Sequence, residues 1–256
     1  MKYKITFVGS GNVATNLAHE LDNSGHTIYQ VISRNITHAK ILASRFGAYY
    51  GDKPSEMYKD ADFVLLCVND EAYFSVLEEL PREMKAIVCH TAGPVGMEIL
   101  ANYSGDYGVF YPLQSFIKEE VKDMLNVPLF IEWSSDKVKE KLYDLADSIS
   151  NKVREVNSIN REKYHLAAVF ANNFTNAMYA LADDYLTANG LEFNNLFPII
   201  KETAERLKKG KPNQWQTGPA KRGDKTVLQK HMSMLEDEQL KAIYEQMSHF
   251  IAQKSH

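Results

Sequence analysis

Cysteine and long apolar segments are both scarce in this sequence. The 256 residues include only two cysteines, Cys67 and Cys89, and both lie at the ends of apolar, strand-like stretches. Isolated thiols in such stretches are typical of buried cysteines, so we expect neither a disulfide framework nor a metal site. No apolar run approaches the ~20 residues that a membrane-spanning helix needs, and we therefore expect no membrane partner.

Charge of one sign is also scarce. The net charge is only -4 and no block of lysine and arginine stands out, so nothing in the charge pattern favours a nucleic-acid partner. The N-terminus, MKYKITFVGS, lacks the apolar core of a signal peptide and is typical of a buried strand. With 45% hydrophobic and 24% charged residues, the composition predicts a packed, soluble, cytoplasmic protein of one large domain or two ordinary ones.

Glycines are concentrated where a predicted strand meets a predicted helix. The apolar run KITFVG (4–9) ends in glycine, and apolar residues recur at helical spacing from Val13 onward. Gly9, Gly11 and Ala14 thus form a glycine-x-glycine-x-x-alanine pattern in the context that predicts dinucleotide binding, the alternative being a structural turn. The residues expected to cradle the pyrophosphate at the helix N-terminus are Gly9, Ser10, Gly11, Asn12 and Val13.

The end of the second predicted strand indicates which dinucleotide binds. TIYQVISRN (27–35) ends in Ser33 and Arg34, where an NAD site usually has an acidic residue for the ribose 2′-hydroxyl. A hydroxyl and a guanidinium suit a 2′-phosphate, which a guanidinium holds through two parallel hydrogen bonds. We therefore expect NADP as the cofactor; the alternative is that Arg34 is an ordinary surface arginine.

Strands and helices then alternate, which predicts a parallel sheet. The predicted helices are 36–48, 71–80 and 135–150, and the predicted strands are 62–70, 86–93, 107–112, 127–133 and 152–157. Ligands bind outside the carboxyl ends of such strands. The residues at those ends that we expect near the ligand are Val68, Asn69, His90 and Thr91. For His90, a bond to a local backbone group is an equally good interpretation. We expect the first domain to comprise residues 1–157 and to end near Asn157.

The second half, 158–256, predicts an all-helical domain. The stretch 158–190 contains no proline and is largely apolar or small, so we expect one long, buried helix, followed by helices at 194–210, 223–235 and 236–252. Four polar residues recur in it at spacings of seven, four and seven, namely His165, Asn172, Asn176 and Asp183, with Asn173 beside them. Such a stripe is either a structural network or one wall of a ligand cleft.

Several segments together resemble a known family. They are GSGNVA, SRN, CVND, HTAG, YPLQSF (111–116), YHLAAVFANNF (164–174) and TGPAKRGD (217–224). Nearly end to end, the chain resembles small Rossmann-type proteins with a helical C-terminal domain of unknown function. These are similar to deazaflavin-dependent NADP reductases, to pyrroline-5-carboxylate reductase and to the 6-phosphogluconate and β-hydroxyacid dehydrogenases.

The resemblance implies a fold and a cofactor. The fold is α/β, with a doubly wound, mostly parallel sheet followed by an all-helical domain like that of 6-phosphogluconate dehydrogenase. NADP would bind the first domain, and the small-molecule substrate would bind between the domains. The helical domain would build a homodimer. In TGPAKRGD, Arg222 and Asp224 would face the nicotinamide, and the arginine would hold a substrate carboxylate. Asp224 is equally suited to cap a helix.

One departure from the resemblance affects the expected mechanism. β-Hydroxyacid dehydrogenases have a lysine four residues before an asparagine on their long helix, whereas Ala168 stands four before Asn172 here. A different proton donor is needed, and His165 or His90 has a suitable ordinary pKa.

Two functions are the main candidates; a deazaflavin-dependent NADP reductase is a weaker third, since no residue identifies a deazaflavin pocket. The first is an NADP-dependent oxidoreductase that transfers a hydride between nicotinamide and a carbonyl or imine of a small anionic substrate. Its candidate catalytic residues are His165, Asn172, Asn173, Arg222 and His90. The second is a non-catalytic NADP sensor or partner-binding protein, which the missing lysine favours and the polar stripe disfavours.

Overall fold

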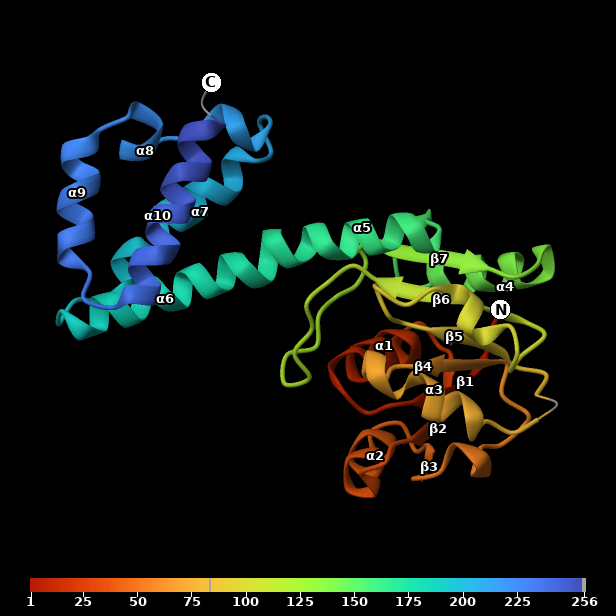
Figure 1. Cartoon of the computed structure of the whole chain (residues 1–256). Helices are drawn as coiled ribbons and strands as arrows, with labels where there is room; N and C mark the ends of the chain where they lie inside the picture. Colours follow the sequence, from red (N-terminus) through yellow and green to blue (C-terminus); the bar gives the residue numbers. More distant parts are fainter. Residues whose placement is uncertain (83, 255–256) are drawn as a thin grey trace. The chain divides into compact units, whose positions relative to one another are not determined.

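A computed structural model describes residues 1–82 and 84–254 of the chain (Figure 1). The chain forms two compact units, Met1–Asn173 and Phe174–His256. The boundary expected near Asn157 stays a prediction. Asn157 is the residue that caps the first helix of the second half, where its side chain accepts a hydrogen bond from the backbone N–H of Asn160.

The first unit is built on one eight-stranded sheet in the order β3-β2-β1-β4-β5-β6-β7-β8. All neighbouring strands are parallel except β6 and β7, which pair antiparallel. The part from β3 to β6 has the strand order of a dinucleotide-binding fold. The strands are β1 Lys4–Val8, β2 Thr27–Ile32, β3 Tyr49–Gly51, β4 Phe63–Leu66, β5 Ile87–His90, β6 Tyr107–Pro112, β7 Leu129–Trp133 and β8 Val153–Glu155.

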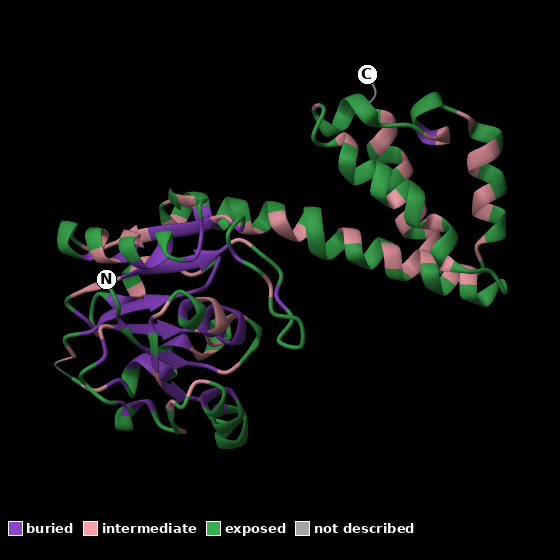
Figure 2. Ribbon diagram, turned by 180° about the vertical axis from the view of Figure 1, so that it is seen from behind, coloured by how far each residue is buried: buried purple, intermediate pink, exposed green. Residues whose placement is uncertain are grey.

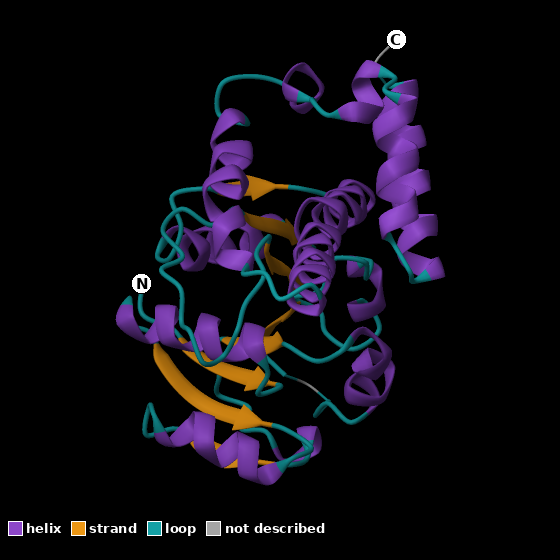
Figure 3. Ribbon diagram, turned by 90° about the vertical axis from the view of Figure 1, so that its left-hand side faces the viewer, coloured by secondary structure: helices purple, strands orange, loops and turns teal. Residues whose placement is uncertain are grey.

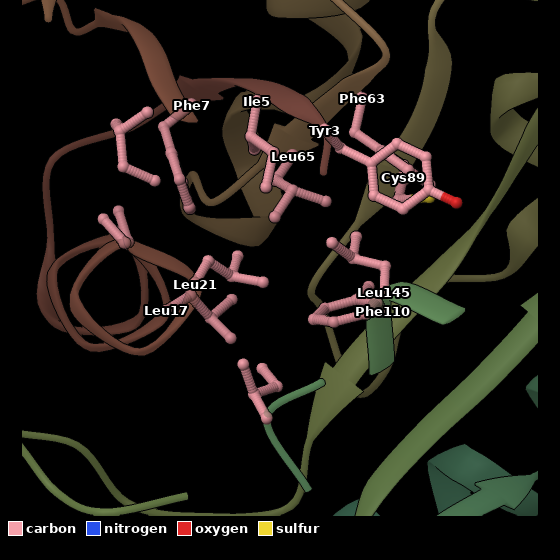
Figure 4. Close-up of a cluster of buried hydrophobic side chains, with 14 of the residues drawn as sticks. Tyr3, Ile5, Phe7, Leu17, Leu21, Phe63, Leu65, Cys89, Phe110 and Leu145 are labelled. Atoms are coloured by element: carbon pink, nitrogen blue, oxygen red, sulfur yellow. The ribbon is translucent and has the colours of Figure 1, made fainter. Parts of the chain in front are cut away.

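Helices cover this sheet, as Figure 3 shows. The helices of the first unit are α1 Asn12–Asn23, α2 Ile36–Ser44, α3 Tyr73–Glu78, α4 Asp136–Asp147 and α5 Ser158–Ala168, with 3-10 turns η1 Pro54–Glu56, η2 Asp70–Ala72 and η3 Met97–Leu100. A largely apolar core joins them. Figure 4 shows Ile5 and Phe7 of β1 and Leu65 of β4 beside Leu17 and Leu21 of α1. Because central parallel strands are buried on both faces, their sequences are nearly continuous apolar runs, which is why they could be predicted.

The second unit contains helices and no strand among its described residues. It contains α6 Thr175–Ala188, α7 Phe197–Arg206, α8 Pro219–Arg222, α9 Lys225–Met234 and α10 Glu238–Gln253, with 3-10 turns η5 Phe193–Leu196 and η6 Pro212–Trp215. The stretch η4 Val169–Phe174, which precedes α6, is a turn of π-helix. Among the described residues, no helix is long and apolar enough to cross a membrane.

The structure corrects three expectations about elements. The helix predicted over 36–48 ends at Ser44, because the chain turns there and adds the short edge strand β3, which was not predicted. The helix predicted over 158–190 is interrupted by the π turn. That helix was also expected to be buried, but Leu166 is 59% exposed and Phe170 is 61% exposed. Figure 2 shows the contrast between the buried sheet and these exposed helices.

The segment 217–224 contains a short helix that was not predicted. Gly218 has a φ of 106°, Pro219 begins the one-turn helix α8, and Gly223 ends it in the left-handed conformation. The side chain of Asp224 then accepts a hydrogen bond from the N–H of Val227, at 3.1 Å, and caps α9. Of the two interpretations offered for Asp224, the geometry supports the capping one.

Candidate functional site

Gly9 makes the turn between β1 and α1. Its φ is +117°, a conformation that side chains rarely adopt, and a Cβ there would lie 2.7 Å from the carbonyl carbon of Cys67. The chain can therefore pass this close to the end of β4 only with a glycine.

Gly11, two residues later, faces open space. A Cβ built on it meets nothing within 4 Å, and as the N-cap of α1 it offers no side chain to the first N–H groups of the helix. A 12-residue helix thus begins with uncapped donors above a glycine that leaves room for an approaching group. Such an arrangement fits a pyrophosphate.

A cavity of about 240 Å³ lies in front of this turn. It is lined by Val8, Gly9, Ser10, Gly11, Asn12, Ile32, Ser33, Arg34, His38, Asp52, Pro54, Cys67, Val68, Asn69, Ala72, Val76 and Lys118. Eight of the ten residues expected to hold the cofactor are in this lining, because the carboxyl ends of β1, β2 and β4 meet here.

Val13 and Thr91 are the two expected cofactor residues outside the lining. Val13 packs against the apolar core, as its place on the inner face of α1 requires. The hydroxyl of Thr91 donates to the carbonyl of Leu66 at 3.1 Å and ties the end of β5 to β4. Their direct role in cofactor binding stays a prediction.

The far end of the cavity is polar. The Ser10 hydroxyl donates to the Ser33 hydroxyl at 2.9 Å, which joins the glycine turn to the end of β2. Arg34 is exposed and makes no ion pair with any described residue, so its guanidinium is available to an anion. His38 on α2 and Asp52 after β3 also line this end, and neither was identified from the sequence. No sequence pattern around His38 or Asp52 indicates a site residue, because both reach the cavity only through the folding of α2 and β3.

Lys118 is another residue that sequence reasoning missed. It belongs to the long segment 113–126, which is tied to α1: the backbone N–H of Lys118 donates to Asn12 Oδ1 at 3.2 Å, and that of Lys122 donates to Asn16 Oδ1 at 2.9 Å. The amide of Asn12 therefore holds this segment in place. The segment in turn brings Lys118 into the lining of a cavity suited to phosphates.

A second cavity, of about 300 Å³, lies within the same unit. It is lined by Tyr111, Leu113, Gln114, Ser115, His165, Ala168, Val169, Asn172 and Asn173. Three of the predicted catalytic residues, His165, Asn172 and Asn173, are thus brought together. Tyr111 was not predicted as a site residue. It lies near the carboxyl end of β6, which is the edge where β1, β4 and β5 also end.

The two asparagines lie in the π turn η4. A π turn inserts an additional residue into a helix and is often found at functional sites. The prediction from sequence spacing assumed a regular α-helix. It therefore could not show that Asn172 and Asn173 both line one cavity. Asn176 and Asp183 of the predicted stripe are not in this lining.

His90 lies at the end of β5 but has no exposed surface. Its Nδ1 accepts a hydrogen bond from the N–H of Ala92 at 3.2 Å, and burial together with the nearby Arg161 lowers its pKa from 6.5 to about 3. A neutral, enclosed imidazole is poorly suited to exchange protons with a substrate. The geometry therefore supports the alternative interpretation, a histidine bonded to local backbone.

Arg222 is in the last turn of α8, in the second unit. Its expected role with a substrate carboxylate stays a prediction. Pro219 and Ala220 of the same helix line an apolar cavity of about 440 Å³ within that unit. Among the described residues, no group of three or more histidine, cysteine, aspartate or glutamate side chains is arranged to hold a metal ion.

Family comparisons agree with this geometry. Residues 4–93 match the family described as NADP oxidoreductase coenzyme F420-dependent, and residues 127–251 match the family described as a domain of unknown function, DUF2520. A crystal structure from Bacteroides fragilis, described as that of a "putative NADP oxidoreductase", is 38% identical over 98% of each chain, with a TM-score of 0.94. No protein of curated function was matched by sequence.

More distant structures have the same fold. One is a 1-pyrroline-5-carboxylate reductase from Streptococcus pyogenes, 16% identical over 99% of this chain and 98% of the other, with a TM-score of 0.65. Another is an imine reductase from Myxococcus stipitatus in complex with NADP+, 14% identical over 98% of this chain and 93% of the other, with a TM-score of 0.69. The expected fold class and resemblance are confirmed. The chain belongs to the NADP oxidoreductase family in which a dinucleotide-binding domain is followed by a DUF2520 domain.

Proposed function

We propose that this oxidoreductase reduces a carbonyl or imine of a small molecule with NADPH. The observation that carries the proposal is the pair of cavities within the first unit. One combines uncapped helix donors with Ser33 and Arg34, and the other contains a titratable side chain, His165. The relatives named as imine and pyrroline-carboxylate reductases favour a C=N bond as the group reduced.

The residues of the first cavity fit NADPH. The N–H groups at the start of α1 and the ammonium of Lys118 neutralise the pyrophosphate, while Ser33 and Arg34 hold the 2′-phosphate. Val68 and Asn69, after β4, line the same cavity and would contact the bound cofactor. NADPH, when bound, supplies a hydride from its nicotinamide ring.

The residues of the second cavity would bind and protonate the substrate. His165 is half-buried at the wall of the cavity, and its imidazole gives a proton to the substrate oxygen or nitrogen as the hydride reaches the carbon. The amides of Asn172 and Asn173 orient the substrate through hydrogen bonds. Arg222, which belongs to the second unit and is not in this lining, is a separate candidate for binding an anionic group of the substrate.

The protein would act as a homodimer. Among the described residues of the second unit, Ala220 alone is buried, so a single copy gives this unit almost no core. A second copy of the chain, packed on the exposed apolar side chains, would supply the missing contacts.

The first test is a titration of the protein with NADPH and with NADH, in which protein fluorescence reports the binding. We expect Arg34→Ala to raise the Kd for NADPH by about 10- to 100-fold, because a charge-assisted hydrogen bond contributes about 1.5–3 kcal/mol, and to leave the Kd for NADH unchanged. Lys40→Ala is the matched control, since Lys40 is also an exposed cation of this region but is outside the cavity lining. An equal effect of Arg34→Ala on both nucleotides would refute the assignment of the 2′-phosphate site.

A second test separates the reductase from the non-catalytic sensor. Loss of NADPH absorbance in the presence of a cyclic imine such as 1-pyrroline-5-carboxylate, or of small keto acids, would show catalysis. Tight NADPH binding with no turnover of any of these compounds would favour the sensor.

A further inference from the structure

His165 is held on two sides by the first unit. On one side, its Nδ1 lies 3.1 Å from the hydroxyl oxygen of Tyr111. On the other side is Gly93, in the loop after β5, where a Cβ would lie 2.5 Å from His165 Cγ. The ring therefore fits its place only because residue 93 has no side chain, and its Nδ1 edge is turned toward Tyr111.

Tyr111 is itself firmly placed. It is 9% exposed, belongs to β6 and pairs with Phe130 of β7 in the antiparallel ladder. The Tyr111 ring lies 6.2 Å from the Phe130 ring and 6.3 Å from the His165 ring, measured between centroids. Burial raises the pKa of the Tyr111 hydroxyl, which keeps it protonated and neutral near neutral pH. A rigid strand thus presents a neutral hydroxyl to the imidazole.

The other ring nitrogen has a different environment. Tyr111 is the partner found for His165 Nδ1 among the described residues, and no hydrogen bond of Nε2 is found there. His165 Nε2 is not one of the buried polar atoms that lack a hydrogen-bond partner. This agrees with a half-buried side chain at the wall of a cavity. One nitrogen is therefore bound to the protein, and the other is left for a ligand.

We infer that Tyr111 is a positioning residue for proton transfer by His165: its hydroxyl oxygen accepts a hydrogen bond from Nδ1–H, which makes Nε2 the nitrogen that exchanges a proton with the substrate. This inference rests on the proposed reductase function. An acceptor at Nδ1 that fixes the ring and leaves Nε2 reactive is an arrangement that hydrolytic enzymes also use, with a carboxylate in place of the hydroxyl.

The proton balance follows from this arrangement. The imidazolium gives its Nε2 proton to the substrate oxygen or nitrogen while hydride adds to the substrate carbon. The neutral ring keeps Nδ1–H, still bonded to Tyr111, and takes a new proton at Nε2 from water. The hydroxyl of Tyr111 stays intact throughout, so no tyrosinate is formed.

The most direct test needs no substrate. In ¹⁵N NMR spectra of the full-length protein at a pH where His165 is neutral, the two ring nitrogens show which one carries the hydrogen. We expect Nδ1–H in the wild type and a shift to Nε2–H in Tyr111→Phe, which removes only the hydroxyl. Tyr107→Phe, at the opposite end of the same strand, is the matched control and should not change the His165 signals. An unchanged tautomer in Tyr111→Phe would overturn the inference.

A kinetic test separates this inference from the proposed function. With NADPH and an imine that the enzyme reduces, we expect Tyr111→Phe to lower kcat by about 10- to 100-fold and to change KM by less than about twofold. In a His165→Ala background, Tyr111→Phe should have no further effect, because Tyr111 acts through His165. Additive losses in the double variant would overturn the positioning role. A wild type that fixes Nδ1–H but reduces no imine would instead count against the proposed function alone.

Discussion

At the scale of single residues, Gly9 and Gly11 are glycines for different physical reasons. Gly9 is required by the fold: its φ is positive and a Cβ would collide with the backbone of Cys67. Gly11 has an ordinary φ of -84° and open space around it, so the fold tolerates a side chain there. The absence of a side chain at Gly11 is useful only to a ligand that approaches the helix.

This difference predicts opposite results for two alanine variants. Gly9→Ala should lower the free energy of unfolding by about 3 kcal/mol or more, since strain and overlap combine. Gly11→Ala should change it by less than about 1 kcal/mol but should raise the Kd for NADPH by about 10-fold or more. Denaturant unfolding and nucleotide titration of both variants would check this. Normal NADPH binding by Gly11→Ala would mean that the pyrophosphate does not approach this turn.

Residues that lie at element ends were predictable, and residues that reach the site through tertiary folding were not. Ser33 and Asn69 could be assigned to the cofactor cavity because parallel strands end at a common edge. Lys118 lies in a segment whose path depends on hydrogen bonds to Asn12 and Asn16, more than a hundred residues earlier. From the sequence, Tyr111 could be predicted only as a strand residue. Its proposed role depends on His165, which lies on a different element.

At the scale of elements, α5 is attached to the sheet by a buried ion pair. Arg161 has no exposed surface, and its guanidinium donates to Glu132 Oε2 of β7 at 2.6 Å, to the carbonyl of Val95 and to the hydroxyl of Ser158 at 3.1 Å. The same Ser158 hydroxyl donates to Glu132 at 2.7 Å. One cluster thus joins the start of α5 to β7 and to the loop that also contains Gly93.

Removal of this arginine should destabilise the protein strongly. We expect Arg161→Ala to lower the free energy of unfolding by about 3–5 kcal/mol, because Glu132 is left as a largely buried charge without its partner. The control is Arg206→Ala, which breaks the Arg206–Glu202 pair of α7, whose side chains are 39% and 50% exposed, and should cost less than about 1 kcal/mol. Denaturant unfolding followed by circular dichroism measures both. If Arg161→Ala lowered the free energy of unfolding by no more than the control does, apolar packing, and not the ion pair, would hold α5 on the sheet.

Elements with a strong periodic or apolar pattern were the ones that the sequence could predict. The strands β1, β4, β5 and β6 are short apolar runs, and each was expected close to its observed position. β3 has only three residues, and two of them, Tyr49 and Tyr50, are exposed, so it lacks the apolar pattern of a buried strand. The π turn η4 was missed because a spacing argument assumes 3.6 residues per turn throughout a helix.

At the scale of the whole molecule, the two units differ in how much core they have. Figure 2 shows that the central strands of the first unit are buried, whereas the second unit has an apolar cavity of about 440 Å³ and many exposed apolar side chains. The apolar pattern over 158–190 predicted a buried helix, and this expectation is wrong for the single chain, in which Leu166 and Phe170 are exposed. A sequence pattern alone does not indicate whether apolar residues pack within the chain or against another molecule.

This difference predicts a homodimer that depends on the second unit. Light scattering coupled to size exclusion should give twice the mass of the chain at micromolar concentration, because a helical unit with Ala220 as its one buried described residue needs further apolar contacts. Met247, which lines the apolar cavity and is 47% exposed, offers a test position. Met247→Glu should shift the protein toward monomer, since a buried carboxylate without a partner is costly, while Lys230→Glu on the exposed face of α9 should not. A wild type that stays monomeric at every concentration would show that the second unit is stable without a second copy.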